Sequence, residues 1–153
     1  MALSDQHGIS SGSITLEITE SGLLEELSAT LDVLTRLRMK NVGLSIDDYG
    51  TGFAMMQHLS VVPATELKIG RAFVKDMLAN DSVGVMVKKT IELGHALGMR
   101  VVAEGVETVQ QLNALRSNGC EIAQGFFFSR PLPVADLASW LRSFRVSPSQ
   151  SLT

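Results

Sequence analysis

Short apolar runs rich in β-branched residues alternate along the chain with longer stretches in which apolar residues recur every three or four positions. The short runs predict strands over residues 14–18, 42–46, 66–69, 100–103 and 121–124. The longer stretches predict helices over residues 23–38, 82–97, 108–118 and 134–144. In the first of these, Leu27, Leu31 and Leu34 would share one face.

This alternation of strand and helix predicts an α/β fold, in which right-handed helical crossovers join parallel strands. Gly98 and Gly119 follow two of the predicted helices, where a left-handed cap is expected. We therefore expect one domain over residues 14–145, with about five βα steps. The polar segments 1–13 and 146–153 are expected to be flexible.

The composition narrows the classes of partner. The 153 residues are 45% hydrophobic and carry a net charge of -3, which is typical of a soluble domain. A chain with this charge lacks the broad basic surface of a DNA- or RNA-binding protein. The longest apolar runs are too short to span a membrane, so a cytoplasmic location without membrane contact is expected. The lone Cys120 is expected to be a small buried residue.

Polar residues follow or end the predicted strands. Glu17, the pair Asp47 and Asp48, and Glu104 lie at the ends of three strands, and Gln124 lies at the end of the fifth. Because the carboxyl ends of parallel strands converge, these acids would repel one another unless cations held them together. The all-oxygen set suits Mg²⁺ or Mn²⁺ better than Zn²⁺.

Two features of this cluster, the pair of aspartates and Lys68, also have a purely structural explanation. Asp47 and Asp48 could each bind one of two metal ions held about 4 Å apart, or they could only open a turn. The presence of four acids at the ends of three strands favours the metal site over the turn. Lys68 lies in an apolar run and needs an anionic partner. It could stabilise a phosphate or hold the attacking water, or it could be a structural ion-pair partner.

Five motifs, in this order, give the chain a resemblance to a known family. They are Leu16-Glu17-Ile18-Thr19-Glu20-Ser21, Asp47-Asp48-Tyr49-Gly50-Thr51-Gly52-Phe53, Leu67-Lys68-Ile69, Ala103-Glu104-Gly105-Val106-Glu107-Thr108 and Gln124-Gly125-Phe126. The chain resembles the EAL domain over residues 14–141. This resemblance implies a TIM-type (β/α) barrel and a phosphodiesterase that hydrolyses cyclic di-GMP to linear pGpG with metal-activated water, in bacterial second-messenger signalling.

The resemblance also implies roles for residues of the metal site. Glu17 and Asp47 would bind the first of two metal ions, and Asp48 would bind the second. Lys68 would contact the attacking water or the phosphate. Glu104 would be the general base or a ligand of the second ion.

Three further residues match family positions around that site. Gln124 would position the site, and both Gln124 and Glu107 would lie on the substrate side. Glu20 would anchor the flexible loop that begins at Asp48, which in the family links dimer contacts to activity.

The chain departs from the family pattern at two places. Gly70 stands where the family usually has Asp, which removes a carboxylate near Lys68. The Glu-Ala-Leu signature and an Asn that would also bind the first metal ion have no counterpart before Ile14. Since a complete barrel takes roughly 250 residues, we expect only its later five βα units here.

Such a truncated barrel leaves the partner and the activity open. We expect an open sheet to expose apolar edges and one face of its core, which a homo-oligomer or the N-terminal half of the domain would cover. The alternative to an active enzyme is a truncated, inactive EAL-type module that binds cyclic di-GMP or a protein partner.

Overall fold

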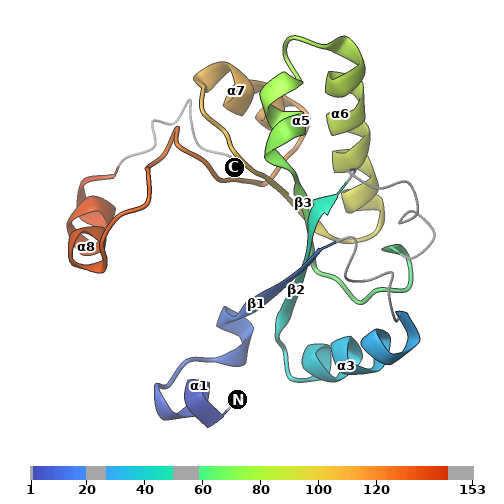
Figure 1. Ribbon diagram of the computed structural model, residues 1–153, viewed down its shortest axis with the longest axis vertical. Coiled ribbons are helices and arrows are strands. Elements are labelled where there is room, and N and C mark those ends of the chain that lie inside the picture. Colours follow the sequence, from blue (N-terminus) through green and yellow to red (C-terminus); the bar gives the residue numbers. More distant parts are fainter. Residues whose placement is uncertain (1, 20–26, 50–58, 145–153) are drawn as a thin grey trace.

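The computed structural model describes residues 2–19, 27–49 and 59–144. Its centre is a five-stranded sheet in which every pair of neighbouring strands is parallel and the strands follow chain order (Figure 1). The strands are β1 (Thr15–Thr19), β2 (Gly43–Tyr49), β3 (Glu66–Ile69), β4 (Arg100–Ala103) and β5 (Ile122–Ala123). All five lie where the sequence predicts strands, and the α/β fold with successive parallel strands is confirmed.

Helices connect these strands as expected, with one addition. The described helices after β1 are α3 (Leu27–Met39), α5 (Arg71–Asp76), α6 (Asp81–Ala96), α7 (Val109–Ser117) and α8 (Val134–Ser143). The six-residue α5 was not predicted, because it is too short to show helical periodicity. Part of the first predicted helix, residues 23–26, lies outside the described residues.

The segment before β1 contains local structure, although the sequence predicts a flexible segment there. It forms a short helix α1 (Ala2–Gln6) and a 3₁₀ turn (Ser11–Ser13). The backbone N–H of Gly43 donates to the carbonyl of Ile14 at 2.8 Å, which ties the end of this segment to β2.

The ends of α6 and α7 are fixed by the expected local chemistry. Asn80 caps α6 by accepting hydrogen bonds from the backbone of residues 82 and 83, at 3.0 and 3.4 Å. Thr108 and Gln111 form a capping box at the start of α7. Gly98 and Gly119 have φ angles of 72° and 86°, which confirms the predicted left-handed caps.

The core lies between the sheet and the helices α3, α5, α6 and α7. Leu44, Ile46 and Leu67 are 0% exposed and pack with Leu34 of α3. The next strands contribute Ile69, Val101 and Ala103, which pack against side chains of α5, α6 and α7. The helix α8 stands apart from these helices (Figure 1), and none of its residues is buried.

In β1, β2 and β3, the strand positions that alternate with this core are polar. Because side chains alternate between the two faces of a strand, the face opposite the helices carries residues of mixed charge rather than an apolar surface. They are Thr15, Glu17, Thr19, Ser45, Asp47, Glu66 and Lys68. For these strands the expectation of an exposed apolar core face is wrong, because the face carries the polar groups of the candidate site.

The described helices include none that is both long and apolar enough to cross a membrane. Cys120 is 3% exposed, as predicted, and its thiol donates to the carbonyls of Val101 and Ile122.

Candidate metal centre

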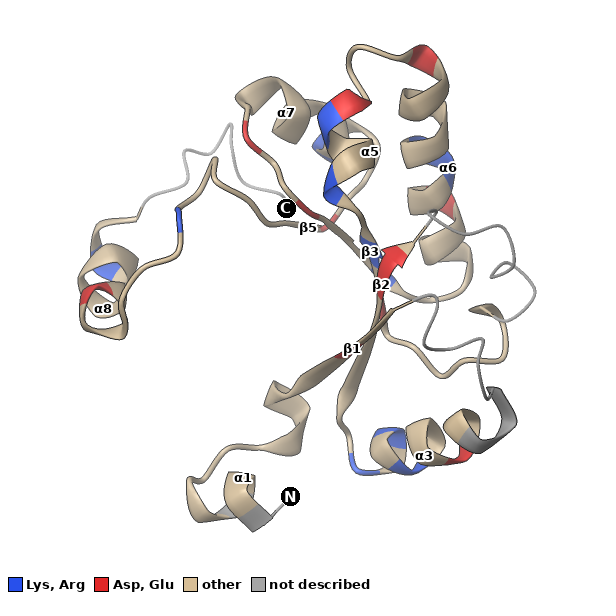
Figure 2. Ribbon diagram, viewed as in Figure 1, with Lys and Arg blue, Asp and Glu red and all other residues tan. Residues whose placement is uncertain are grey.

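The parallel register brings residues from four strands to one edge of the sheet. Thr19 is paired with Asp47, and Lys68 is paired with Val102, two residues before Glu104. The acidic positions and Lys68 therefore gather where β2 and β3 end (Figure 2). The sequence prediction that these residues converge is confirmed for Glu17, Asp47, Asp48, Lys68 and Glu104.

Lys68 lies at the centre of this cluster. Its Nζ atom lies 2.8 Å from a carboxylate oxygen of Glu17, 3.1 Å from one of Asp47 and 2.6 Å from one of Glu104. Its side chain is only 6% exposed. Burial would lower the pKa of the ammonium, but hydrogen bonds to Glu104, Glu17 and Asp47 outweigh this and raise that pKa above its ordinary value. Lys68 is therefore a permanent positive charge among the acids.

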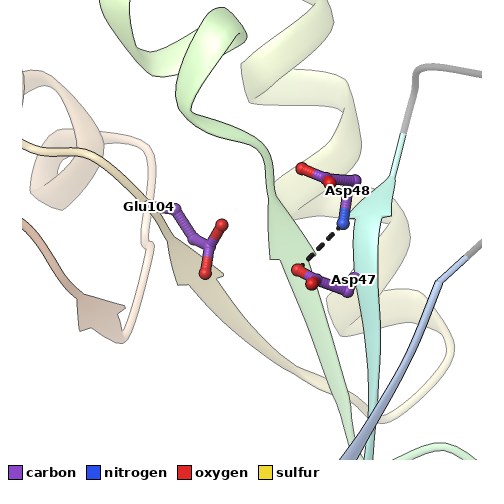
Figure 3. A group of neighbouring side chains, drawn as sticks. All are labelled: Asp47, Asp48 and Glu104. Atoms are coloured by element: carbon purple, nitrogen blue, oxygen red, sulfur yellow. Dashed lines mark hydrogen bonds between the residues drawn. The ribbon is translucent and has the colours of Figure 1, made fainter.

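Three of the acids lie close enough together to share a cation. Oxygen atoms of Asp47, Asp48 and Glu104 all lie within 4.8 Å of one another. The side chains of Asp47 and Asp48 leave the same strand, and the carboxylate of Glu104 points toward them from across β3 (Figure 3). Carboxylate oxygens in this arrangement fit a hard divalent cation such as Mg²⁺ or Mn²⁺.

Asp48 has an unusual backbone conformation for a residue in a strand. Its φ angle is 53°, in the left-handed region, and the pairing of β2 with β3 shifts register between Ile46 and Tyr49. The N–H of Asp48 donates to Oδ1 of Asp47 at 3.0 Å. The bulge thus lets two consecutive residues both present carboxylates to one site, which a regular strand would direct to opposite faces.

Glu107 and Gln124 line a cavity of about 190 Å³ beside Glu104. Arg71 and Phe126 line it as well, and the guanidinium of Arg71 forms an ion pair of 2.7 Å with Glu107. The cavity therefore offers one cationic group, an aromatic ring and polar groups next to the carboxylates. Glu107 and Gln124 therefore lie next to Glu104, and their role on the substrate side stays a prediction.

Sequence reasoning missed two residues of this cavity. Arg71 begins α5, the helix that the periodicity does not predict, and Phe126 begins a run of three phenylalanines of a kind more common in core packing. The guanidinium of Arg130 lies 4.7 Å from the centre of the Phe126 ring. The guanidinium of Arg71 lies 6.0 Å from the centre of the same ring. The sequence signal that could have identified Arg71 and Arg130 is their position, since each lies within a few residues of a motif that matches the family.

Part of the predicted site lies outside the described residues. This holds for Glu20 and for the loop residues that follow Tyr49, from Gly50 to Phe53.

Comparison with known proteins places this chain in a family. A sequence model of the EAL domain matches residues 1–131. The cyclic di-GMP phosphodiesterase NbdA of Pseudomonas aeruginosa is 41% identical over 148 residues, which are 97% of this chain and 19% of that protein. The chain thus spans about a fifth of the length of this relative.

Solved structures agree in fold. A structure of the PaMucR phosphodiesterase in complex with c-di-GMP is 37% identical, with a TM-score of 0.84, over 89% of this chain and 55% of that one. The Klebsiella pneumoniae BlrP1 complex with manganese and cyclic di-GMP is 31% identical, with a TM-score of 0.78, over 85% of this chain and 34% of that one. Together with the geometry of the carboxylates and Lys68, these matches show that the chain belongs to the EAL domain family.

Proposed function

We propose that this chain forms the later part of a cyclic di-GMP phosphodiesterase site, which binds two divalent cations, Mg²⁺ or Mn²⁺, and opens cyclic di-GMP to linear pGpG. The observation that carries the proposal is the meeting of Asp47, Asp48 and Glu104 within 4.8 Å beside the buried ammonium of Lys68. The manganese and cyclic di-GMP named for the BlrP1 structure support the choice of cation and substrate.

Different carboxylates would bind the two cations. Glu17 and Asp47 would hold one ion and Asp48 the other, with Glu104 as a second ligand or as the general base that takes a proton from water. When bound, the cations supply the positive charge that activates the attacking water and stabilises the leaving oxygen. In the reaction, the water oxygen bonds to phosphorus and one ester P–O bond opposite to it breaks.

The other residues would orient the substrate. The Lys68 ammonium lies among the carboxylates, where it can donate a hydrogen bond to the attacking water or to a phosphate oxygen. Glu107 and Gln124 line the adjacent cavity, where the nucleotide would extend from its reacting phosphate. Glu20 is proposed as the anchor of the loop after Asp48.

Further strands are required to complete a barrel around this half of the site. Leu16 of β1 is 41% exposed, and Val134, Leu137 and Leu141 of α8 are 87%, 44% and 58% exposed. We propose that another polypeptide segment of the same fold covers them, either in a second copy or in the N-terminal half of a barrel. Light scattering on the assayed sample distinguishes these two sources.

The function is tested by titrating the purified chain with cyclic di-GMP in Ca²⁺ and then analysing products by chromatography after exchange into Mn²⁺ or Mg²⁺. We expect binding in Ca²⁺ and conversion to pGpG in Mn²⁺. Binding without conversion supports the alternative of an inactive receptor module, which Gly70 favours because it removes a carboxylate. The absence of both binding and conversion would overturn the proposed function for this chain.

A further inference from the structure

The cavity beside Glu104 brings a carboxylate, a guanidinium and an aromatic ring to one small space. The charged groups are those of Glu107 and Arg71, and the ring is that of Phe126. The cavity holds about 190 Å³, whereas pockets for drug-sized ligands usually hold about 300–1,000 Å³. Its volume therefore suits one heteroaromatic ring rather than a whole cyclic dinucleotide.

Two chain segments that form the walls of this cavity are tied to each other through their backbones. The N–H of Val106 donates to the carbonyl of Gln124 at 3.0 Å, and the N–H of Phe127 donates to the carbonyl of Val106 at 2.9 Å. A Cβ atom on Gly125 would overlap the backbone of Val106, so the two segments approach closely only because this residue is a glycine. The walls that carry Glu107 and Phe126 are thus preformed for a ligand.

The side chain of Arg71 is held against the same wall. Its aliphatic stem lies beside Gly105, where a Cβ atom would overlap it, and its guanidinium bonds Oε1 of Glu107 at 2.7 Å. Among the described residues, the hydrogen bonds of the Glu107 carboxylate involve Oε1 alone. Since a carboxylate can accept about four hydrogen bonds, Glu107 retains acceptor capacity for a ligand.

The pairing of opposite charges indicates which chemical class of ligand fits. A phosphate would be attracted by the guanidinium of Arg71 but repelled by the carboxylate of Glu107, which already balances that charge. A neutral ring with polar edges meets no such repulsion, and it can pack against Phe126. The cavity is thus better suited to a nucleobase than to a second phosphate.

The carboxylate also distinguishes between the two purines. Guanine presents two neighbouring donors, N1–H and the N2 amino group, on its Watson–Crick edge, and one carboxylate can accept from both. Adenine presents one amino donor beside the ring acceptor N1, which a carboxylate cannot satisfy. A base that Glu107 contacts on this edge is therefore expected to be guanine.

We propose that this cavity binds one guanine base of the cyclic dinucleotide, with Glu107 accepting hydrogen bonds from N1–H and the N2 amino group and Phe126 packing against the base. Arg71 is the positioning residue that holds the carboxylate of Glu107. This inference rests on the proposed function, because the substrate supplies the base. It deepens that function by assigning the choice of base to particular residues.

The test compares the affinities of the full chain for cyclic di-GMP and for its adenine analogue cyclic di-AMP, by calorimetric titration in Ca²⁺. Wild type should bind cyclic di-GMP more tightly. Glu107→Gln should reduce the ratio of the two affinities about 10-fold, because an amide satisfies one guanine donor instead of two and can donate to N1 of adenine. Phe126→Leu should weaken the binding of both compounds about 10-fold and leave their ratio unchanged, because every base has a face that packs against an aromatic ring.

A matched control is available on α6. Glu92 forms an ion pair of 2.6 Å with Lys89, and its side chain is 47% exposed, against 45% for Glu107. Glu92→Gln thus removes a comparable surface ion pair away from the cavity, and it should leave both affinities unchanged. Both glutamine variants should keep the wild-type melting temperature, because exposed ion pairs contribute little to stability.

The outcomes separate this inference from the proposed function. A wild-type ratio of affinities that persists in Glu107→Gln overturns the role of the cavity alone, and so does unfolding of that variant, which would make the ion pair a structural element. Absence of binding of cyclic di-GMP to wild type overturns both proposals. A ratio that falls in Glu107→Gln, without conversion of cyclic di-GMP by wild type in Mn²⁺, supports this inference and overturns the catalytic proposal.

Discussion

The Nζ atom of Lys68 lies 2.6 Å from Oε1 of Glu104, which follows the neighbouring strand β4. The same ammonium contacts Glu17 of β1 and Asp47 of β2, so the buried Lys68 of β3 links acids from three other strands. Lys68 thereby does two things. It neutralises part of the mutual repulsion of the acids, and in the proposed function it donates a hydrogen bond to the attacking water or to a phosphate oxygen.

Replacement of Lys68 by methionine should separate these two roles. Without a divalent cation, Lys68→Met should lower the free energy of unfolding by about 2 kcal/mol, because three carboxylates lose their counter-charge. Mn²⁺ should restore most of this stability, since it supplies positive charge to the same oxygens. Urea unfolding with and without Mn²⁺ measures both effects.

The catalytic role that we propose for Lys68 is tested with the same variant by its effect on turnover. Turnover should fall far more than Mn²⁺ affinity, and equal losses would contradict its placement near water or phosphate. Lys89→Met is the matched control, because Lys89 forms an equally short but exposed ion pair with Glu92. That variant should change stability by less than about 0.5 kcal/mol.

Asp47→Asn tests the metal assignment. The change keeps the size of the side chain but removes its charge, so Mn²⁺-dependent hydrolysis should fall by on the order of 100-fold or more while the fold is retained. Glu17→Ala should act in the same direction. Turnover is measured by the formation of pGpG, with Glu92→Gln as a surface control. Unchanged turnover in both site variants would show that the cation binds elsewhere.

Gln111 connects the cavity beside the metal centre to the helices. Its side-chain oxygen accepts hydrogen bonds from the backbone N–H groups of Glu107 and Thr108 at 2.9 and 3.0 Å. Its amide nitrogen donates to the carbonyl of Val74 at 3.2 Å. Gln111→Ala should lower the free energy of unfolding by about 2 kcal/mol, because it leaves these backbone groups without the side chain that pairs with them.

The adjacent residue provides the control for this prediction. Gln110 is exposed, so Gln110→Ala should leave stability within about 0.5 kcal/mol of wild type. Thermal unfolding of both variants, followed by circular dichroism, makes the comparison. Equal melting temperatures would mean that water replaces the bonds of Gln111 without cost.

The sequence predicts the sheet and the cluster of acids because both follow from simple periodic rules. Buried strands are apolar, and parallel strands bring their carboxyl ends together, so Glu17, Asp47 and Glu104 could be assigned to one edge without coordinates. The polar face of the sheet was harder to foresee. Alternation in β1 and β2 places Glu17 and Ser45 on it, but such a pattern also fits strands with one solvated face.

Local irregularities are what the sequence does not reveal. The bulge that turns Asp48 toward Asp47 depends on the pairing of β2 with β3, and pairing register is a property of two segments. The proximity of Asp48 and Gly70 likewise involves residues 22 positions apart in the chain. From the sequence, Gly70 is visible only as a missing carboxylate, whereas the structure places it beside the carboxylate of Asp48.

Cys120 gives a prediction for alkaline pH. Burial raises the pKa of its thiol from 9.0 to about 11. Between these values the unfolded chain releases a proton that the folded chain retains, so stability is complete below pH 9 and is lost as pH rises toward 11. The loss from this one group should be about 1.4 kcal/mol per pH unit. Cys120→Ala removes it, at a cost of about 1–2 kcal/mol at pH 7 for the smaller side chain.

The measurement is urea unfolding of wild type and Cys120→Ala at pH 7, 9 and 10.5 under reducing conditions. Wild type should be the more stable protein at pH 7, and the difference should shrink or change sign by pH 10.5. Other groups, Lys68 included, titrate alike in both proteins, so their contributions cancel in the difference. Stabilities that fall in parallel over this range would contradict the buried neutral thiol, and so would rapid reaction of the folded wild type with a thiol reagent at pH 8.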